Sequence, residues 1–222
     1  MKLWLASIDP AQVARDFEFG LFAGVLTNPT TLAAGRRPAL TLIQELCAAT
    51  TAPVFYQLKH TSVEDMKRQA DHALQTGAAN LGVKVPLTRE GCAVLHWLRE
   101  RGVALRLATA VATPAQLVLA TALEVPWVTP SGSALEKLGG PSKLELLSAM
   151  QIMLDRQQAS TVLIPSLTSP SEMAALAAAG VRAGFIWDRD VDRFVTHELA
   201  QQITASFAPA WNRLEAAAGA NY

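Results

Sequence analysis

Cysteine is scarce in this chain, with two residues in 222, and histidine is nearly as scarce, with four. Cys47 and Cys92 both fall in segments of helical periodicity among apolar neighbours, and no CxxC motif accompanies either. This pattern predicts buried free thiols and argues against a disulfide framework or a zinc site. No two histidines stand at HxxxH or HxH spacing, so we expect no metal, and nothing indicates another cofactor.

The chain also lacks an excess of charge of either sign, because 19 basic residues balance 19 acidic residues. Without a broad positive field, electrostatics alone would hold neither nucleic acid nor an anionic membrane. Long apolar runs are missing too, since Gly, Pro or a charged residue interrupts each run before the roughly 18 residues that a membrane span needs. We therefore expect a cytoplasmic protein without nucleic-acid or membrane partners, which meets any anionic ligand locally.

The order of segments predicts the fold. Half of the chain is hydrophobic, enough for the core of one α/β barrel, and short apolar runs alternate with longer amphipathic segments. The predicted strands are Leu3–Leu5, Gly24–Thr27, Val54–Gln57, Leu81–Val85, Val103–Ala108, Trp127–Thr129, Val162–Pro165 and Gly184–Trp187. Eight such strands favour closure, so we expect fold class α/β, a single (β/α)8 TIM barrel over residues 1–222. An additional C-terminal helix and tail at 207–222 is expected to contact a neighbouring subunit.

Capping signals mark several helix boundaries. Ser62, Thr88 and Ser169 each stand directly before a helical segment, where a hydroxyl can accept the first free backbone N–H groups. Glycines that end helices just before strands are Gly77, Gly102 and Gly180. One residue breaks the pattern: Arg106 lies inside an apolar strand, and we expect it to pair with a buried carboxylate.

Polar residues gather at the predicted C-terminal ends of the strands, where barrels carry their chemistry. These residues are Ser7, Asn28, Gln57, Lys84, Thr109, Thr129, Ser166 and Asp188. Lys84 lies in the run LGVKVP, so Val83 and Val85 face one side of the sheet and the lysine faces the barrel interior. Desolvation there lowers the pKa of the amine, and a neutral amine can attack a carbonyl. The alternative is a surface lysine on a short exposed strand.

Several motifs carry a family resemblance: AGVLTNPTTLAAG, VFYQLKHTS, LGVKVPLTREG, ATAV, the pair Gly139-Gly140 and IPSLTSP. Together and in this order they resemble the fructose-6-phosphate aldolases and small transaldolases, from Leu3 to about Trp211. The resemblance implies a class I aldolase that acts on ketoses or hydroxyketones, phosphorylated or not, through a lysine Schiff base. It also implies a homo-oligomer, a pentamer or decamer.

The resemblance assigns roles to individual residues. Lys84, in the V-K-V-P-x-T stretch, is implied to be the Schiff-base nucleophile, and Gln57 and Thr109 are implied to hold a catalytic water. Glutamine at position 57 is typical of the family's aldolases, whereas members that transfer a dihydroxyacetone unit tend to carry glutamate. The implied substrate contacts are Thr27, Asn28 and, at the phosphate end, Ser166. For Asn28 and Ser166, turn chemistry alone is an equal explanation.

Three positions depart from the family pattern. Ala6 stands where the family has an aspartate that takes part in proton transfer, and Pro130 aligns with a tyrosine that shares the catalytic water. Ser133 aligns with the phosphate-binding arginine and remains a candidate substrate contact by position. Without that bidentate clamp, unphosphorylated or differently charged substrates are favoured.

Other residues are candidates for the missing roles. Asp188 ends strand 8, which neighbours strand 1 in a closed barrel, so its carboxylate can replace the aspartate in proton transfer, or it can cap the following helix. Lys59 and His60 follow Gln57, and either can serve as proton donor or anion contact, or remain a solvated loop residue. Two rival functions remain. The protein can be a transaldolase, or it can be a family member without turnover that acts as a binding or scaffold protein.

Overall fold

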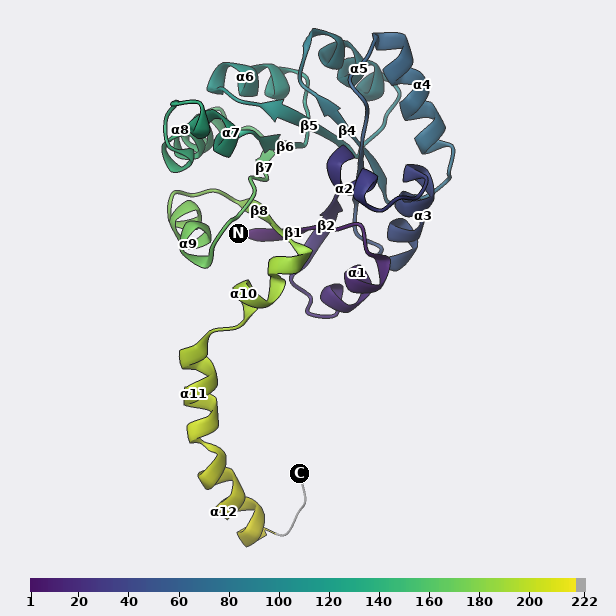
Figure 1. The fold of residues 1–222 in the computed structure, drawn as a ribbon. Coiled ribbons are helices and arrows are strands. Elements are labelled where there is room, and N and C mark those ends of the chain that lie inside the picture. The colour runs from purple at the N-terminus through teal and green to yellow at the C-terminus, as the bar shows by residue number, and fades with distance from the viewer. Residues whose placement is uncertain (219–222) are drawn as a thin grey trace. The chain divides into compact units, whose positions relative to one another are not determined.

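Eight parallel strands form a barrel in the computed structural model, which describes residues 1–218 (Figure 1). The strands are β1 Lys2–Ala6, β2 Phe22–Leu26, β3 Val54–Gln57, β4 Leu81–Pro86, β5 Arg106–Val111, β6 Trp127–Pro130, β7 Val162–Leu163 and β8 Ala183–Trp187. Their order is β7-β6-β5-β4-β3-β2-β1-β8. The barrel closes where Ser166 bridges Phe185, whose N–H donates to the carbonyl of Pro165 at 2.8 Å. The predicted TIM barrel is confirmed.

Helices surround the strands of the unit Met1–Asp188 (Figure 1). They are α1 Pro10–Phe17, α2 Pro29–Ala34, α3 Ala39–Ala49, α4 Val63–Leu74, α5 Arg89–Glu100, α6 Pro114–Ala122, α7 Gly132–Lys137, α8 Lys143–Arg156 and α9 Pro170–Ala178. Ser62, Thr88 and Ser169 accept backbone N–H groups as N-caps of α4, α5 and α9, as predicted. No helix among residues 1–218 is long and apolar enough to cross a membrane.

The C-terminal unit, Arg189–Tyr222, is helical as far as it is described. A 3-10 turn, η1 Asp188–Asp190, leads into it, and its helices are α10 Val191–Val195, α11 Glu198–Ser206 and α12 Ala208–Ala218. The expected C-terminal helix is therefore present as α12, and α10 and α11 were not predicted. Residues 219–222 of the predicted tail lie outside the described part, and its contact with a neighbouring subunit stays a prediction.

Most predicted strands match closely, but the predicted β5, Val103–Ala108, was wrong by three residues at each end, and the predicted β7 was two residues too long. β5 begins at Arg106 and not at Val103, because the N–H of Val103 is used to close the end of α5 on the carbonyl of Leu98, at 3.0 Å. β7 ends at Leu163 and does not reach Pro165, since proline has no N–H for the ladder.

The predictions for Arg106 and for the two cysteines had different outcomes. Arg106 donates to the backbone carbonyls of Val103 and, at 3.0 Å, Glu124, so its pairing with a buried carboxylate was wrong. Cys47 is buried and Cys92 half-buried, both as free thiols. Burial raises the pKa of the Cys47 thiol to about 11, which leaves it protonated and unreactive at neutral pH.

Aromatic side chains fill the part of the barrel interior nearer the N-terminal ends of the strands, which we call the lower layer. The upper layer lies at the C-terminal ends. Trp4, Phe55 and Trp127 lie with ring centroids 5.5 to 6.0 Å apart. Glycine makes room for them: a Cβ at Gly24 would lie 2.2 Å from the Trp4 ring, and one at Gly82 would lie 2.4 Å from the Phe55 ring. Each buried aromatic of this kind stabilises the fold by roughly 1.5 to 3 kcal/mol. The packed lower layer leaves the opposite end of the interior for polar groups.

Candidate active site

The interior of the barrel changes from apolar to polar in one step along the strands. The lower layer holds Trp4, Leu26, Phe55, Gly82, Leu107, Trp127, Ile164 and Phe185. Since side chains two residues apart in a strand share a face, the next interior layer follows at once. It consists of Ala6, Asn28, Gln57, Lys84, Thr109, Thr129, Ser166 and Trp187. Six of the eight positions at the mouth therefore carry a polar side chain.

Lys84 is the only charged side chain of this upper layer. It is 7% exposed, and its Nζ donates to the backbone carbonyl of Thr27 at 3.3 Å. No carboxylate among residues 1–218 contacts its ammonium group, so nothing offsets the loss of hydration. Burial consequently lowers the pKa of Lys84 to about 8. At pH 7 about one amine in ten is then neutral, compared with far fewer than one in a thousand for an ordinary lysine.

Gln57 and Thr109 lie on the strands that flank Lys84. Gln57 is the register partner of Lys84 across β3 and β4, and Thr109 pairs with Pro86 across β4 and β5. Neither side chain makes a hydrogen bond within residues 1–218, so both can bind water or substrate. Ala110, directly after Thr109, has φ of +61° and forms an irregularity in β5. Such a bulge ends the regular pairing and redirects the neighbouring side chains at a strand end.

Thr27 and Asn28 are partly committed to the backbone. The Thr27 hydroxyl donates to the carbonyl of Phe55 at 2.8 Å, while its own carbonyl accepts Lys84. The Asn28 Oδ1 caps α2 by accepting the N–H of Thr31 at 3.0 Å. Its amide nitrogen makes no hydrogen bond in the described part of the chain. Asn28 therefore serves as a helix cap and still offers two N–H donors to the mouth.

Two further polar groups belong to this region: Thr129, which was expected at the end of its strand, and Lys143, which was not singled out from the sequence. Thr129 is buried, and its hydroxyl has no hydrogen-bond partner among residues 1–218, which is costly unless a water or ligand supplies one. Lys143, at the start of α8, has a side chain 6% exposed and donates to the carbonyl of Ser166 and to Glu172 Oε1 at 2.8 Å. It holds the end of β7 in place from outside the layer.

Asp188 and Ser7 are one residue beyond the interior-facing Trp187 and Ala6. The Ser7 hydroxyl donates to Asp188 Oδ2 at 2.7 Å, and the Asp188 carbonyl accepts the Gln12 side chain at 2.9 Å. Both residues lie just past the ends of their strands, and Asp188 begins the 3-10 turn η1. Asp188 does not contact Lys84 directly. The N-cap of α10 is Asp190, not Asp188.

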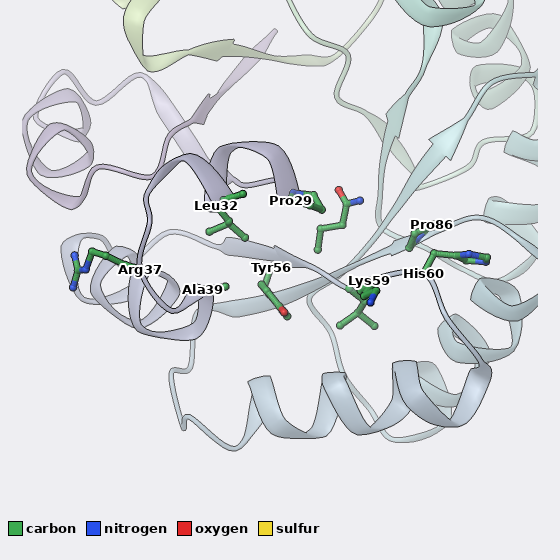
Figure 2. A pocket seen from close by; sticks show the side chains of 11 residues that line it. Pro29, Leu32, Arg37, Ala39, Tyr56, Lys59, His60 and Pro86 are labelled. Carbon is green, nitrogen blue, oxygen red and sulfur yellow. The ribbon is translucent and has the colours of Figure 1, made fainter.

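A cleft of about 450 Å³ lies over the end of β3 (Figure 2). Pro29 and Leu32 of α2 lie on one side, and Lys59, His60 and Pro86 lie on the other (Figure 2). Gln57 also lines this cleft, whereas Lys84 does not. Ser133, the remaining candidate, is half-buried in the first turn of α7, and no hydrogen bond of its side chain is found within residues 1–218.

Metal ligands are not grouped in the described residues: no set of three or more His, Cys, Asp or Glu side chains there can hold an ion. The mouth presents the Lys84 amine together with amide and hydroxyl groups.

Comparison with known proteins identifies relatives along nearly the whole chain. The model of the family described as transaldolase/fructose-6-phosphate aldolase matches residues 3–181. A probable transaldolase of Rhodospirillum centenum is 28% identical over 215 residues, which cover 96% of this chain and 92% of the relative. A probable transaldolase of Lactiplantibacillus plantarum is 28% identical over 217 residues, covering 97% and 99% of the two chains. Probable transaldolase 2 of Listeria monocytogenes is 24% identical over 211 residues, covering 95% and 96%.

Proposed function

Because this chain belongs to the transaldolase/fructose-6-phosphate aldolase family, we propose that it is a class I aldolase in which Lys84 forms a Schiff base with a ketose or hydroxyketone. The observation that carries the proposal is the buried, uncompensated amine of Lys84 within a ring of polar side chains at the barrel mouth. A lowered pKa supplies the neutral nucleophile that attack on a carbonyl requires.

The proposed reaction begins with addition of neutral Lys84 to the ketone carbon. The resulting carbinolamine loses water and becomes an iminium ion. The positive nitrogen withdraws the electron pair of the adjacent carbon–carbon bond, which breaks as the neighbouring hydroxyl gives up its proton and becomes an aldehyde. The electron pair remains as an enamine on Lys84. Protonation of the enamine carbon and hydrolysis release the hydroxyketone and restore the amine.

Proton transfer in this scheme needs a base near the substrate hydroxyl, and two arrangements compete. In the first, a water held between Gln57 and Thr109 receives the proton; the unpartnered side chains of both residues support it. In the second, Asp188 takes the place of the family aspartate that Ala6 has lost, and acts through Ser7 or a water. The Asp188–Ser7 hydrogen bond holds a carboxylate beside the end of β1, one residue beyond Ala6.

We assign substrate contacts to the polar atoms at the barrel mouth that have no hydrogen-bond partner among residues 1–218. The amide nitrogen of Asn28 and the hydroxyl of Ser166 have no partners among residues 1–218, and both belong to the interior layer. The Thr27 hydroxyl, already bonded to Phe55, can only accept a further hydrogen bond. Ser133 and Lys59 are proposed to contact the distal part of the substrate.

Transaldolase activity is the second candidate, and the names of the relatives favour it. The two activities share the enamine and differ in its fate: an aldolase protonates it, whereas a transaldolase passes it to a second aldehyde. Incubation with fructose 6-phosphate alone tests the proposal. Release of dihydroxyacetone and glyceraldehyde 3-phosphate supports an aldolase, and cleavage that requires an added acceptor aldehyde supports a transaldolase. If neither fructose 6-phosphate nor its unphosphorylated form turns over under either condition, the aldolase proposal fails.

Assembly into a homo-oligomer, a pentamer or decamer, is proposed from the C-terminal unit. Helices α11 and α12, with the turn residue between them, expose Leu199, Ile203, Phe207, Trp211 and Leu214, each about half accessible. The spacing of three or four residues gives each helix an apolar stripe, Leu199 and Ile203 on α11 and Trp211 and Leu214 on α12. A stripe of this kind is typical of a surface that another subunit covers.

A further inference from the structure

The β3 cleft, defined by Pro29, Leu32, Tyr56, Gln57, Lys59 and His60 among its lining residues, combines an apolar wall with basic groups (Figure 2). Its volume of about 450 Å³ lies in the range of small-molecule sites. Leu32 and Leu58 are buried beneath its surface, and the Tyr56 ring is half-buried. A ligand with a short apolar segment would fit this wall.

The cleft is connected to the candidate nucleophile through two of its residues. Gln57 is the register partner of Lys84 on β3, and Pro86 follows Lys84 by two residues on the same face of β4. The inner end of the cleft therefore lies beside the upper layer of the barrel interior. Gln57 and Pro86 are therefore the residues by which the cleft borders the position of Lys84.

The charges of the cleft single out Lys59. Arg37 makes a bidentate ion pair with Glu45, and Figure 2 shows it at the end of the cleft opposite His60. The Nε2 atom of His60 is hydrogen-bonded to the Thr88 hydroxyl at 3.1 Å and lies 3.5 Å from the Oε2 atom of Glu90. The Lys59 ammonium, by contrast, has no hydrogen bond or ion pair among residues 1–218. It is the one basic group of the lining that is left to meet an anion.

The end of β7 has a basic group in a different situation. Lys143 is the basic group beside Ser166, but it is buried and neutralised by Glu172 at 2.8 Å. Its side chain also donates to the carbonyl of Ser166 and so cannot turn towards a ligand without breaking two contacts. An anionic substrate group is thus favoured at the β3 cleft over the β7 end.

We propose that the β3 cleft binds the acceptor aldehyde, and that it selects aldehydes with a short apolar chain ending in an anion, a carboxylate or phosphate, held by Lys59. This inference rests on the proposed function, because the aldehyde must meet an enamine on Lys84. The enamine carbon attacks the aldehyde carbon and forms the new carbon–carbon bond. The carbonyl electron pair moves to oxygen, which takes a proton from water, and hydrolysis of the iminium frees Lys84.

The test uses dihydroxyacetone as donor and pairs of acceptors matched in length. Butanal is compared with 4-oxobutanoate for a carboxylate, and glyceraldehyde with glyceraldehyde 3-phosphate for a phosphate. Since Lys59 is exposed, the ion pair is screened, and kcat/KM for the anionic member should be higher by roughly three- to fivefold, mainly through KM. The pair with the larger ratio identifies the anion that the cleft prefers.

Substitutions distinguish binding of the anion by Lys59 from a general effect of the protein's charge. Lys59→Gln should remove the preference for the anionic aldehyde, and Lys59→Arg should keep it. Lys67→Gln is the matched control, because Lys67 lies on α4, paired with Glu64, and does not line the cleft. Equal kcat/KM values within both acceptor pairs in the unmodified protein would overturn the inference, and so would a preference that survives in Lys59→Gln.

Failure of the inference is distinguishable from failure of the proposed function. Reductive trapping of dihydroxyacetone on Lys84 needs no acceptor aldehyde. If an adduct forms on Lys84 but the enzyme shows no preference between acceptors, only the role of the cleft is overturned. If no adduct forms with dihydroxyacetone or hydroxyacetone, the role of the cleft and the proposed function are both overturned.

Discussion

The Ser7 hydroxyl donates to the Asp188 carboxylate across 2.7 Å and links the end of β1 to the end of β8. The two residues stand beside Ala6, the position where the family carries its aspartate. The link is compatible with a proton-transfer role and with a purely structural one, and substitution separates them.

Asp188→Asn is expected to slow carbon–carbon cleavage by roughly two to four orders of magnitude if Asp188 transfers the proton, yet leave adduct formation on Lys84 detectable. Asparagine still accepts the Ser7 hydrogen bond, so a structural role predicts a loss below about tenfold. Single-turnover cleavage rates measure the difference. Ser7→Ala is the companion variant, because it removes the hydrogen-bond donor but no ionisable group. A larger loss in Ser7→Ala than in Asp188→Asn would favour the structural role, whereas a large loss in both would mean that Asp188 acts through Ser7.

The rate of Schiff-base formation should follow the ionisation of Lys84. Burial lowers the pKa of this amine to about 8, so the neutral fraction rises with pH up to and through that value. Trapping of dihydroxyacetone by cyanoborohydride should therefore accelerate from about pH 6 to 9 and reach half its maximum near 8. A half-maximum near 10.5, the ordinary lysine value, would mean that the amine is not desolvated.

Lys84→Met should abolish aldol activity while increasing the free energy of unfolding at neutral pH. The folded-state pKa of Lys84 lies below its unfolded-state value, so burial of the charged amine costs stability in full below about pH 8. That cost disappears as pH rises from about 8 towards 10.5. The stability difference between variant and unmodified protein should accordingly shrink over this window in urea titrations. A pH-independent difference would contradict the lowered pKa, and retained turnover in the variant would place the chemistry elsewhere.

The exposed apolar residues of α11 and α12 favour an assembly, and the family resemblance implies five or ten subunits. Light scattering should give about five or ten times the chain mass of 23.7 kDa. Phe207→Ser combined with Trp211→Ser should reduce it, because both side chains are more than half exposed in the isolated chain. Leu119→Ser on α6 is the control, with an apolar side chain of similar exposure outside the stripe. A single-chain mass for the unmodified protein would refute the predicted oligomer.

Strand periodicity carried most of what could be predicted from the sequence. The alternation of LGVKVP places Lys84 inside the barrel, and the same rule applied to FIW would have placed Trp187 beside Ala6. Lys143 could not be found in this way. It opens a helix directly after the cap Ser142, a normal place for a surface lysine, and its burial depends on Gly132, where a Cβ would come within 3.1 Å of its chain.

The hydrogen-bond partners of the residues at the barrel mouth also could not be predicted from the sequence. The sequence left Asn28 as either a helix cap or a substrate contact, and the structure shows that one atom caps while the other remains available. The partner of Arg106 was misjudged because backbone carbonyls at the end of a helix and in a loop leave no trace in residue type. Such contacts depend on tertiary placement, which local patterns do not encode.

Reductive trapping tests the central claim most directly. The protein is incubated with dihydroxyacetone or hydroxyacetone and borohydride, digested, and mapped by mass spectrometry, with Lys84→Met as the control. We expect one reduced adduct per chain, located on Lys84 and lost in the variant. An adduct located on another lysine, or none with either ketone, would contradict it.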